Sequence, residues 1–143
     1  MSWVNKFHRV ANLISSFSKD PSTQVGAVAF DHSNRIIETG YNGLPRNVVD
    51  LPERMERPQK YLWTAHAEEN LVAHAARSRL EGTTVVVTHF PCARCARMLI
   101  NAGVAMVIYR EQATAMDNEE FVVARQMFKE ANIVISQLEK ESL

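Results

Sequence analysis

The sequence has little that would cross-link the chain or hold it in a membrane. Only two of its 143 residues are cysteines, Cys92 and Cys95, three positions apart, so a framework of disulfides is excluded as the basis of stability. No apolar run approaches the length of a membrane span. The first residues lack the basic and then apolar pattern of a signal peptide. We therefore expect a cytoplasmic protein without a membrane partner.

An excess of charge of either sign is also lacking. Lysine and arginine together number 16, aspartate and glutamate together number 16, and the formal net charge is zero. Non-specific binding to nucleic acid depends on basic surface, so this balance argues against a nucleic-acid partner. A local basic pocket for a single phosphate remains compatible with it. The length is typical of one domain, which we expect to span residues 1–143.

The first third of the chain predicts a helix followed by a β-hairpin. Apolar residues at helical spacing indicate an amphipathic helix over 2–18, with Ser2 as its cap. Two short strands are expected over 25–30 and 35–41, joined by a polar turn. The proline-rich stretch 42–61 predicts a long irregular loop, a kind of segment that often carries function.

The rest of the chain alternates predicted helices and strands. In order they are a helix over 65–80 capped by Thr64, a strand over 83–88, a helix over 91–102 with Pro91 in its first turn, a strand over 104–109, a helix over 118–130 and a strand over 133–135. Such alternation implies a largely parallel sheet covered by helices, and the opening hairpin makes the sheet mixed.

Two short motifs carry the chemistry. His66 and Glu68 stand at the start of one predicted helix, and Cys92 and Cys95 stand at the start of another, roughly 25 residues further on. Two thiolates and one imidazole are good zinc ligands, and they leave a fourth position for a water whose pKa the metal lowers. Glu68 is expected to face that water as a general acid and base. This spacing is the signature of zinc nucleobase deaminases.

The same residues allow other interpretations. A lone pair of cysteines three apart is also typical of redox sites and of structural zinc. His89 lies close to Cys92 in the sequence, so a closed site with two cysteines and two histidines is conceivable. The non-enzymatic alternative is therefore a binding module or structural zinc domain, in which Glu68 would have no role.

Four stretches resemble the cytidine/deoxycytidylate deaminase superfamily. They are SKDPSTQVGA at 18–27, GYNGLPR at 40–46, HAEEN at 66–70 and the run from PCARCA to INAGV at 91–104. The first two point to the deoxycytidylate branch. The resemblance implies a three-layer α/β/α fold with a mixed five-stranded sheet. It also implies one zinc per subunit, held by His66, Cys92 and Cys95 at the N-termini of two neighbouring helices.

The activity that the resemblance implies is hydrolytic deamination of dCMP to dUMP and ammonia, which supplies dUMP for thymidylate synthesis. Glu68 would protonate N3 of the base and then the leaving amine. The expected substrate contacts are Lys19 and Tyr109 for the 5′-phosphate, Asn42 for the 3′-hydroxyl and the backbone of Ala65 and Ala67 for the base. Ser22 and Thr23 are expected at the entrance, and Asn70 is expected to tie a loop to its helix.

The resemblance also implies a homo-hexamer activated by dCTP and inhibited by dTTP, with Mg²⁺ accompanying a triphosphate effector. Asn42, Gly43 and Arg46 are the candidate effector residues. Many relatives continue with a Gly-Cys pair and acidic residues, whereas this chain has Asn-Val-Val-Asp at 47–50, which leaves regulation open.

Two alternative activities are considered. One is deamination of dCTP or of a 5-modified dCMP, which the sequence does not separate from dCMP. The other is deamination of tRNA adenosine or single-stranded DNA cytosine, against which zero net charge and the GYNGLPR stretch argue.

Overall fold

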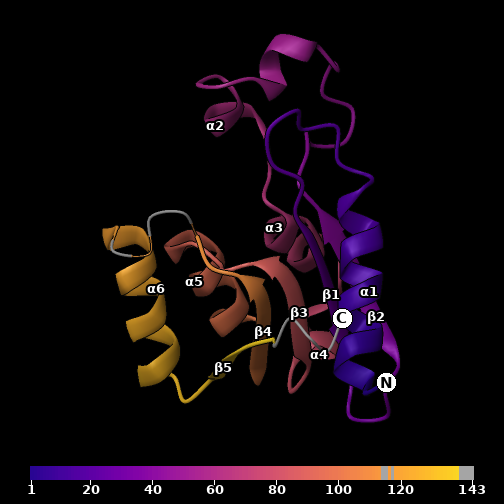
Figure 1. Cartoon of the computed structure of the whole chain (residues 1–143), viewed down its shortest axis with the longest axis vertical. Helices are drawn as coiled ribbons and strands as arrows, with labels where there is room; N and C mark the ends of the chain where they lie inside the picture. The colour runs from indigo at the N-terminus through magenta and orange to yellow at the C-terminus, as the bar shows by residue number, and fades with distance from the viewer. Residues whose placement is uncertain (114–115, 117, 139–143) are drawn as a thin grey trace.

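A computed structural model describes residues 1–113, 116 and 118–138 as one five-stranded sheet flanked by helices (Figure 1). The strand order is β2-β1-β3-β4-β5. The strands are β1 (Gly26–Phe30), β2 (Ile36–Tyr41), β3 (Thr84–His89), β4 (Met106–Glu111) and β5 (Val134–Gln137). β1 runs antiparallel to β2 and to β3, whereas β3, β4 and β5 are parallel. The mixed sheet is confirmed, but only half of its pairings are parallel, because the hairpin joins the sheet through its first strand.

Helices cover both faces of this sheet. Helix α1 (Trp3–Ser15) packs Phe7 and Ala11 against Val28 and Val86 on one face. The other face carries α3 (Ala67–His74), α5 (Ala93–Asn101) and α6 (Glu119–Glu130), as Figure 1 shows. Alternate residues of β1 and β3 point to opposite faces, so each strand serves both cores. The three-layer architecture is thereby confirmed. No helix in the described ranges is long and apolar enough to cross a bilayer.

The predicted helix over 65–80 is two helices, α3 and α4 (Arg77–Leu80). No glycine or proline marks the break at Ala75 and Ala76. Thr64 does not cap α3, because its Oγ1 donates to the Lys60 carbonyl oxygen at 2.7 Å and His66 takes the N-cap position instead.

The other helix ends are closer to their predicted positions. Ser2 caps α1 as expected, through a bond from Asn5 N–H to Ser2 Oγ of 3.2 Å. That helix ends at Ser15, three residues earlier than predicted. Pro91 stands before α5 rather than in its first turn, since Cys92 is the N-cap residue.

The stretch 42–61, which was predicted to be irregular, belongs to a long loop that leaves the body of the domain and returns to it. Its ends pair with each other: Ala65 N–H donates to the Gly43 carbonyl oxygen at 2.8 Å, and Gly43 N–H donates to that of Ala65 at 3.1 Å. Between them lie a short 3-10 helix, η1 (Pro52–Met55), and one helical turn, α2 (Lys60–Trp63). Figure 1 shows this segment standing above the sheet and the helices.

The close approach of β2 to α3 depends on Gly40. A Cβ on Gly40 would lie 2.3 Å from the Ala67 carbonyl oxygen and 2.7 Å from the Leu71 nitrogen. Next to this contact, Asn70 Nδ2 donates to the Tyr41 carbonyl oxygen at 2.8 Å, so Asn70 ties α3 to the end of β2 rather than to a loop. The first turn of α3 is therefore held directly against the sheet.

Candidate active site

The three predicted zinc ligands meet where the N-termini of α3 and α5 converge. Cys92 is the N-cap residue of α5, Cys95 lies in its first turn, and His66 is the N-cap residue of α3. The Nδ1 atom of His66 is 3.3 Å from Cys95 Sγ and 3.5 Å from Cys92 Sγ. All three ligand atoms lie within 4.8 Å of one another. Zinc–ligand distances of about 2.0–2.3 Å fit such a group around one ion, with a tetrahedral position left over.

The two thiols are electrostatically unequal. A hydrogen bond from Cys95 lowers the pKa of Cys92 against the opposing effect of burial, and His66 lowers it further. The same hydrogen bond, together with burial, raises the pKa of Cys95. Both sulfur atoms lie at the N-terminus of α5, next to the N-terminus of α3. This donor set fits a divalent cation, which favours both thiolates.

Glu68 lies beside this group in the first turn of α3. It is only 4% exposed, and burial raises the pKa of its carboxyl to about 7, although the His66 charge opposes the shift. A buried carboxyl that holds or releases a proton near neutral pH suits general acid–base chemistry. His89 does not join the group: its Nδ1 is 2.8 Å from Thr88 Oγ1, and its Nε2 is 3.4 Å from Glu111. This geometry disfavours the closed site with two histidines.

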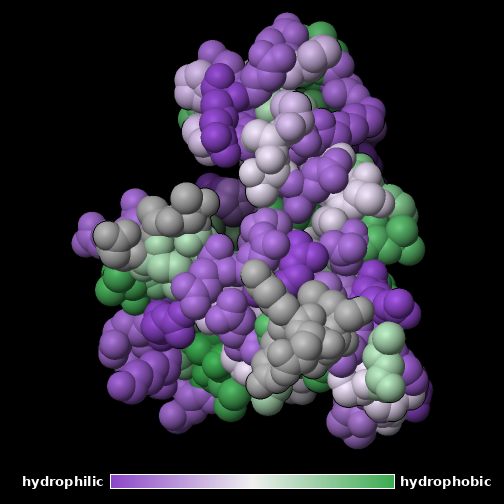
Figure 2. All heavy atoms as spheres, viewed as in Figure 1, coloured by the Kyte–Doolittle hydropathy of each residue, from purple (hydrophilic) through white to green (hydrophobic). Residues whose placement is uncertain are grey.

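The group opens into a pocket of about 200 Å³. Its floor includes His66, Glu68 and Cys92. Tyr61 of α2 and Phe121 of α6 also line it. Figure 2 shows a recess between the projecting segment and the α6 side of the body, in agreement with this lining. The pocket can admit a small molecule to the metal group.

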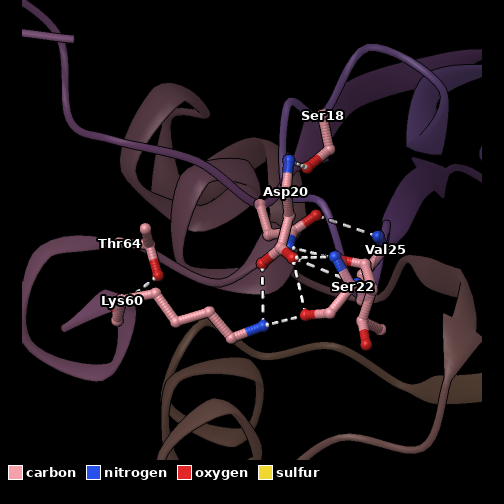
Figure 3. Close-up of polar contacts among 8 residues, drawn as sticks. Ser18, Asp20, Ser22, Val25, Lys60 and Thr64 are labelled. Atoms are coloured by element: carbon pink, nitrogen blue, oxygen red, sulfur yellow. Dashed lines mark hydrogen bonds and ion pairs between the residues drawn. The ribbon is translucent and has the colours of Figure 1, made fainter. Parts of the chain in front are cut away.

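A polar network forms another wall of the pocket (Figure 3). Asp20 Oδ1 accepts the backbone N–H groups of Ser22 at 2.8 Å and Thr23 at 3.0 Å. Lys60 Nζ donates to Asp20 Oδ2 at 2.9 Å and to Ser22 Oγ at 2.8 Å. Burial alone would raise the pKa of Asp20, but these hydrogen bonds hold it below its usual value. The network joins the loop after α1 to the distant helix α2.

Asn42 extends the network to the end of β2. Its Oδ1 accepts Val25 N–H at 2.9 Å, and its Nδ2 donates to the Thr23 carbonyl oxygen at 2.9 Å. Asn42, Thr23 and Ala67 all line the pocket, as a role in substrate binding requires. Ser22 lies behind this wall, bonded to Asp20 and Lys60.

Three predicted substrate residues do not reach the pocket. Lys19 is 75% exposed and pairs with Asp50 at 2.6 Å, outside the pocket. Tyr109 is buried in the core at right angles to the Phe90 ring. Both backbone polar groups of Ala65 are taken by Gly43. The family resemblance suggested these residues as substrate contacts. Here the Lys19 and Tyr109 side chains point elsewhere, and the Ala65 backbone pairs with Gly43.

The proposed effector residues line more than one cavity. Gly43 and Arg46 line a cavity of about 390 Å³ beside β2 and α3, and Asn42 lines the active-site pocket. Asn42 and Gly43 also share a third cavity of about 210 Å³. The residue that the sequence reasoning missed is Lys60. No motif marks a lysine in the middle of an irregular stretch, and only the fold brings it to the pocket wall.

Comparison with known protein families gives a match over most of the chain. The family described as the cytidine and deoxycytidylate deaminase zinc-binding region matches residues 1–111. An Aliivibrio fischeri protein, described as an uncharacterized deaminase in the luxG 3′ region, is 44% identical over 95% of this chain and 93% of its own length. The deoxycytidylate deaminase of Mus musculus is 37% identical over 93% of this chain and 78% of its own. The chain belongs to the cytidine and deoxycytidylate deaminase family.

Solved structures with the same fold have diverse substrates. The dCMP deaminase of cyanophage S-TIM5, in complex with dCMP and dUMP, is 22% identical, with a TM-score of 0.73 over 93% of this chain and 94% of that one. A tRNA:A34 deaminase is 18% identical, with a TM-score of 0.63 over 96% of this chain and 100% of that one. At these identities the likeness establishes the fold alone.

Proposed function

We propose that this protein deaminates dCMP hydrolytically to dUMP and ammonia. The observation that carries the proposal is the buried Glu68 beside the His66, Cys92 and Cys95 group, at a pocket that Glu68, His66 and Cys92 line. A scaffold protein gains nothing from a carboxyl group desolvated next to a metal site. The substrate is supported by relatives named deoxycytidylate deaminase, which align with more than nine-tenths of this chain.

His66, Cys92 and Cys95 are proposed to hold one zinc ion per subunit. When bound, zinc supplies an activated water at neutral pH. Nδ1 of His66 faces the sulfur atoms, so the protein presents an imidazole nitrogen and two thiolates to the same point. The N-termini of α3 and α5 converge at this point, and their positive potential favours thiolate over thiol when the metal binds.

Glu68 is proposed as the proton carrier. Hydrolysis at C4 of cytosine requires a proton on N3 and then a second on the departing amine. The buried carboxyl of Glu68 can carry both protons, because the attacking water supplies them. The first is released as the water adds to C4. The second comes from the hydroxyl group left on C4, which becomes the carbonyl as ammonia departs. Asn42 and the Ala67 backbone are proposed to hold the deoxyribose and the base from the facing walls.

Ammonia release from a panel of cytosine compounds tests this function. Zinc-loaded protein should deaminate dCMP more efficiently than dCTP, 5-methyl-dCMP or an oligonucleotide containing cytosine. Relatives named deoxycytidylate deaminase support a mononucleotide over a polymer. Turnover confined to the oligonucleotide would replace this proposal with a nucleic-acid deaminase.

Assembly and regulation extend the proposal. A homo-hexamer with dCTP and dTTP as effectors, and Mg²⁺ with the triphosphate, is the arrangement that the family resemblance suggests. The cavity lined by Gly43 and Arg46 is the candidate effector site, because it is separate from the active-site pocket yet borders α3 through Asn70 and His74. Sedimentation with and without dCTP tests the assembly, and dCMP turnover under both effectors tests the regulation.

A further inference from the structure

Basic side chains are scarce around the active-site pocket. Among the described residues that line it, Lys60 is the only lysine or arginine. The other charged or titratable side chains there include Asp20 and Glu68, both of which repel an anion when ionised. A phosphate monoester entering this pocket therefore needs Lys60 to offset its charge.

Lys60 is held in place before any ligand arrives. Its side chain is 9% exposed, and that of its partner Asp20 is 2% exposed. Figure 3 shows the extended Lys60 side chain reaching from α2 to Asp20 and Ser22. A lysine fixed in this way has already lost most of its rotamer freedom, so binding a ligand costs little further entropy.

The ion pair with Asp20 leaves Lys60 able to bind an anion. An ammonium group carries three N–H donors, and in the described part of the chain only two of them have acceptors, Asp20 Oδ2 and Ser22 Oγ. The Asp20 carboxylate is also shared, because it accepts the N–H groups of Ser22 and Thr23. These bonds draw charge away from the oxygen that faces Lys60 and leave the ammonium incompletely neutralised.

The alternatives that the sequence suggested lie elsewhere. Lys19 is engaged with Asp50 on the surface, and Tyr109 is buried behind Phe90. Arg125 of α6 stacks on the Phe90 ring at 4.8 Å and stands outside the pocket lining. Arg94 contacts His66 Nε2 at 3.2 Å but pairs with Glu69 and does not line this pocket.

We propose that Lys60 Nζ is the ligand of the substrate's 5′-phosphate and thereby sets the preference for a nucleotide over a nucleoside. The inference rests on the proposed function, since it concerns the same pocket. Asp20 and Ser22 act as positioning residues that aim the ammonium group. Deoxycytidine has the same base and sugar but no phosphate, so it gains nothing from Lys60.

The test compares dCMP with deoxycytidine in wild-type protein and in Lys60→Met. The variant should lose roughly 10- to 100-fold in kcat/KM for dCMP, the range of one hydrogen bond to a charged group. Most of that loss should appear in KM. The kcat/KM for deoxycytidine should stay within about threefold of wild type, so the ratio between the two substrates collapses.

Two further variants keep the test decisive. Lys60→Met leaves Asp20 buried without its partner, so the double variant D20N/K60M removes both charges together and preserves the packing. It should show the same loss of preference for dCMP. Lys19→Met is the matched control, a nearby lysine outside the pocket, and should keep the wild-type ratio.

The outcomes separate the inference from the proposed function. An equal loss for dCMP and deoxycytidine in both Lys60 variants would mean a purely structural ion pair and would overturn the phosphate assignment. A changed ratio in Lys19→Met alone would overturn it as well. If the zinc-loaded wild type deaminates neither compound, the proposed function itself fails, and the assignment fails with it.

Discussion

Glu68 and Glu69 are neighbours in the sequence but meet opposite environments. Glu69 Oε1 accepts the His66 backbone N–H at 2.8 Å and pairs with Arg94 at 3.0 Å, so it closes the start of α3. Glu68 is buried at the pocket beside the metal group. Consecutive residues of an α-helix point about 100° apart around its axis. The Glu69 carboxylate therefore caps the helix, whereas the Glu68 carboxyl faces the pocket.

This contrast yields a matched pair of variants. Glu68→Gln keeps the size of the side chain and removes its proton chemistry, so it should lower kcat for dCMP by about 100- to 10,000-fold while zinc content stays at wild type. Glu69→Gln keeps an oxygen that accepts the His66 N–H and loses only the ion pair with Arg94, so it should retain most of the turnover with little change in melting temperature. Comparable activity in the two variants would contradict the assignment of Glu68 as the proton carrier.

The zinc assignment predicts metal contents. Cys95→Ser should lose bound zinc, because it removes a ligand whose sulfur lies 3.3 Å from His66 Nδ1. His89→Gln is the control, since His89 lies outside the group. Metal analysis after dialysis should find zinc near one equivalent in His89→Gln and well below it in Cys95→Ser. Zinc loss in His89→Gln would revive the closed site with two histidines.

The close packing of α3 against Gly40 should affect both stability and zinc binding. Gly40→Ala places a Cβ against the backbone of Ala67 and Leu71, which cannot move without shifting α3. The variant should be destabilised by at least about 3 kcal/mol in urea unfolding and should bind zinc more weakly. At Gly43 the nearest atom to such a Cβ lies 4.0 Å away, so Gly43→Ala should unfold close to wild type.

The sequence predicted the sheet and the metal group because both depend on local patterns. Apolar periodicity marked the strands, and residue types at short spacing marked His66, Cys92 and Cys95. The network of Asp20 and Lys60 could not be predicted, since it joins residues 40 positions apart through a segment without periodicity. The split between α3 and α4 was missed for a related reason, because no helix breaker accompanies it.

His8 predicts a pH dependence of stability. Both of its ring nitrogens are buried without a partner among the described residues, and burial together with Arg110 lowers its pKa below 6.5, while Glu111 acts in the other direction. The unfolded chain therefore takes up a proton first as the pH falls. The contribution of neutral His8 to the free energy of unfolding is therefore complete above pH 6.5. Below pH 6.5 the free energy of unfolding falls by up to about 1.4 kcal/mol per pH unit.

Denaturant unfolding between pH 7.5 and 5.5 measures this contribution. His8→Phe replaces the imidazole with an apolar ring, and its stability should fall less steeply with pH than that of wild type. His32→Gln, a change in the exposed turn between β1 and β2, serves as the control and should follow the wild-type slope. If the free energy of unfolding fell equally steeply with pH in wild type and in His8→Phe, His8 would not be the source of the pH dependence.

The most direct test of the account is the stoichiometry of one reaction. Zinc-loaded protein is incubated with dCMP, and both ammonia and dUMP are quantified, with Glu68→Gln beside it. We predict that the wild type releases one ammonia for each dUMP formed and that the variant, with equal zinc, forms neither at a comparable rate. Zinc-loaded wild-type protein that leaves dCMP unchanged would contradict the account.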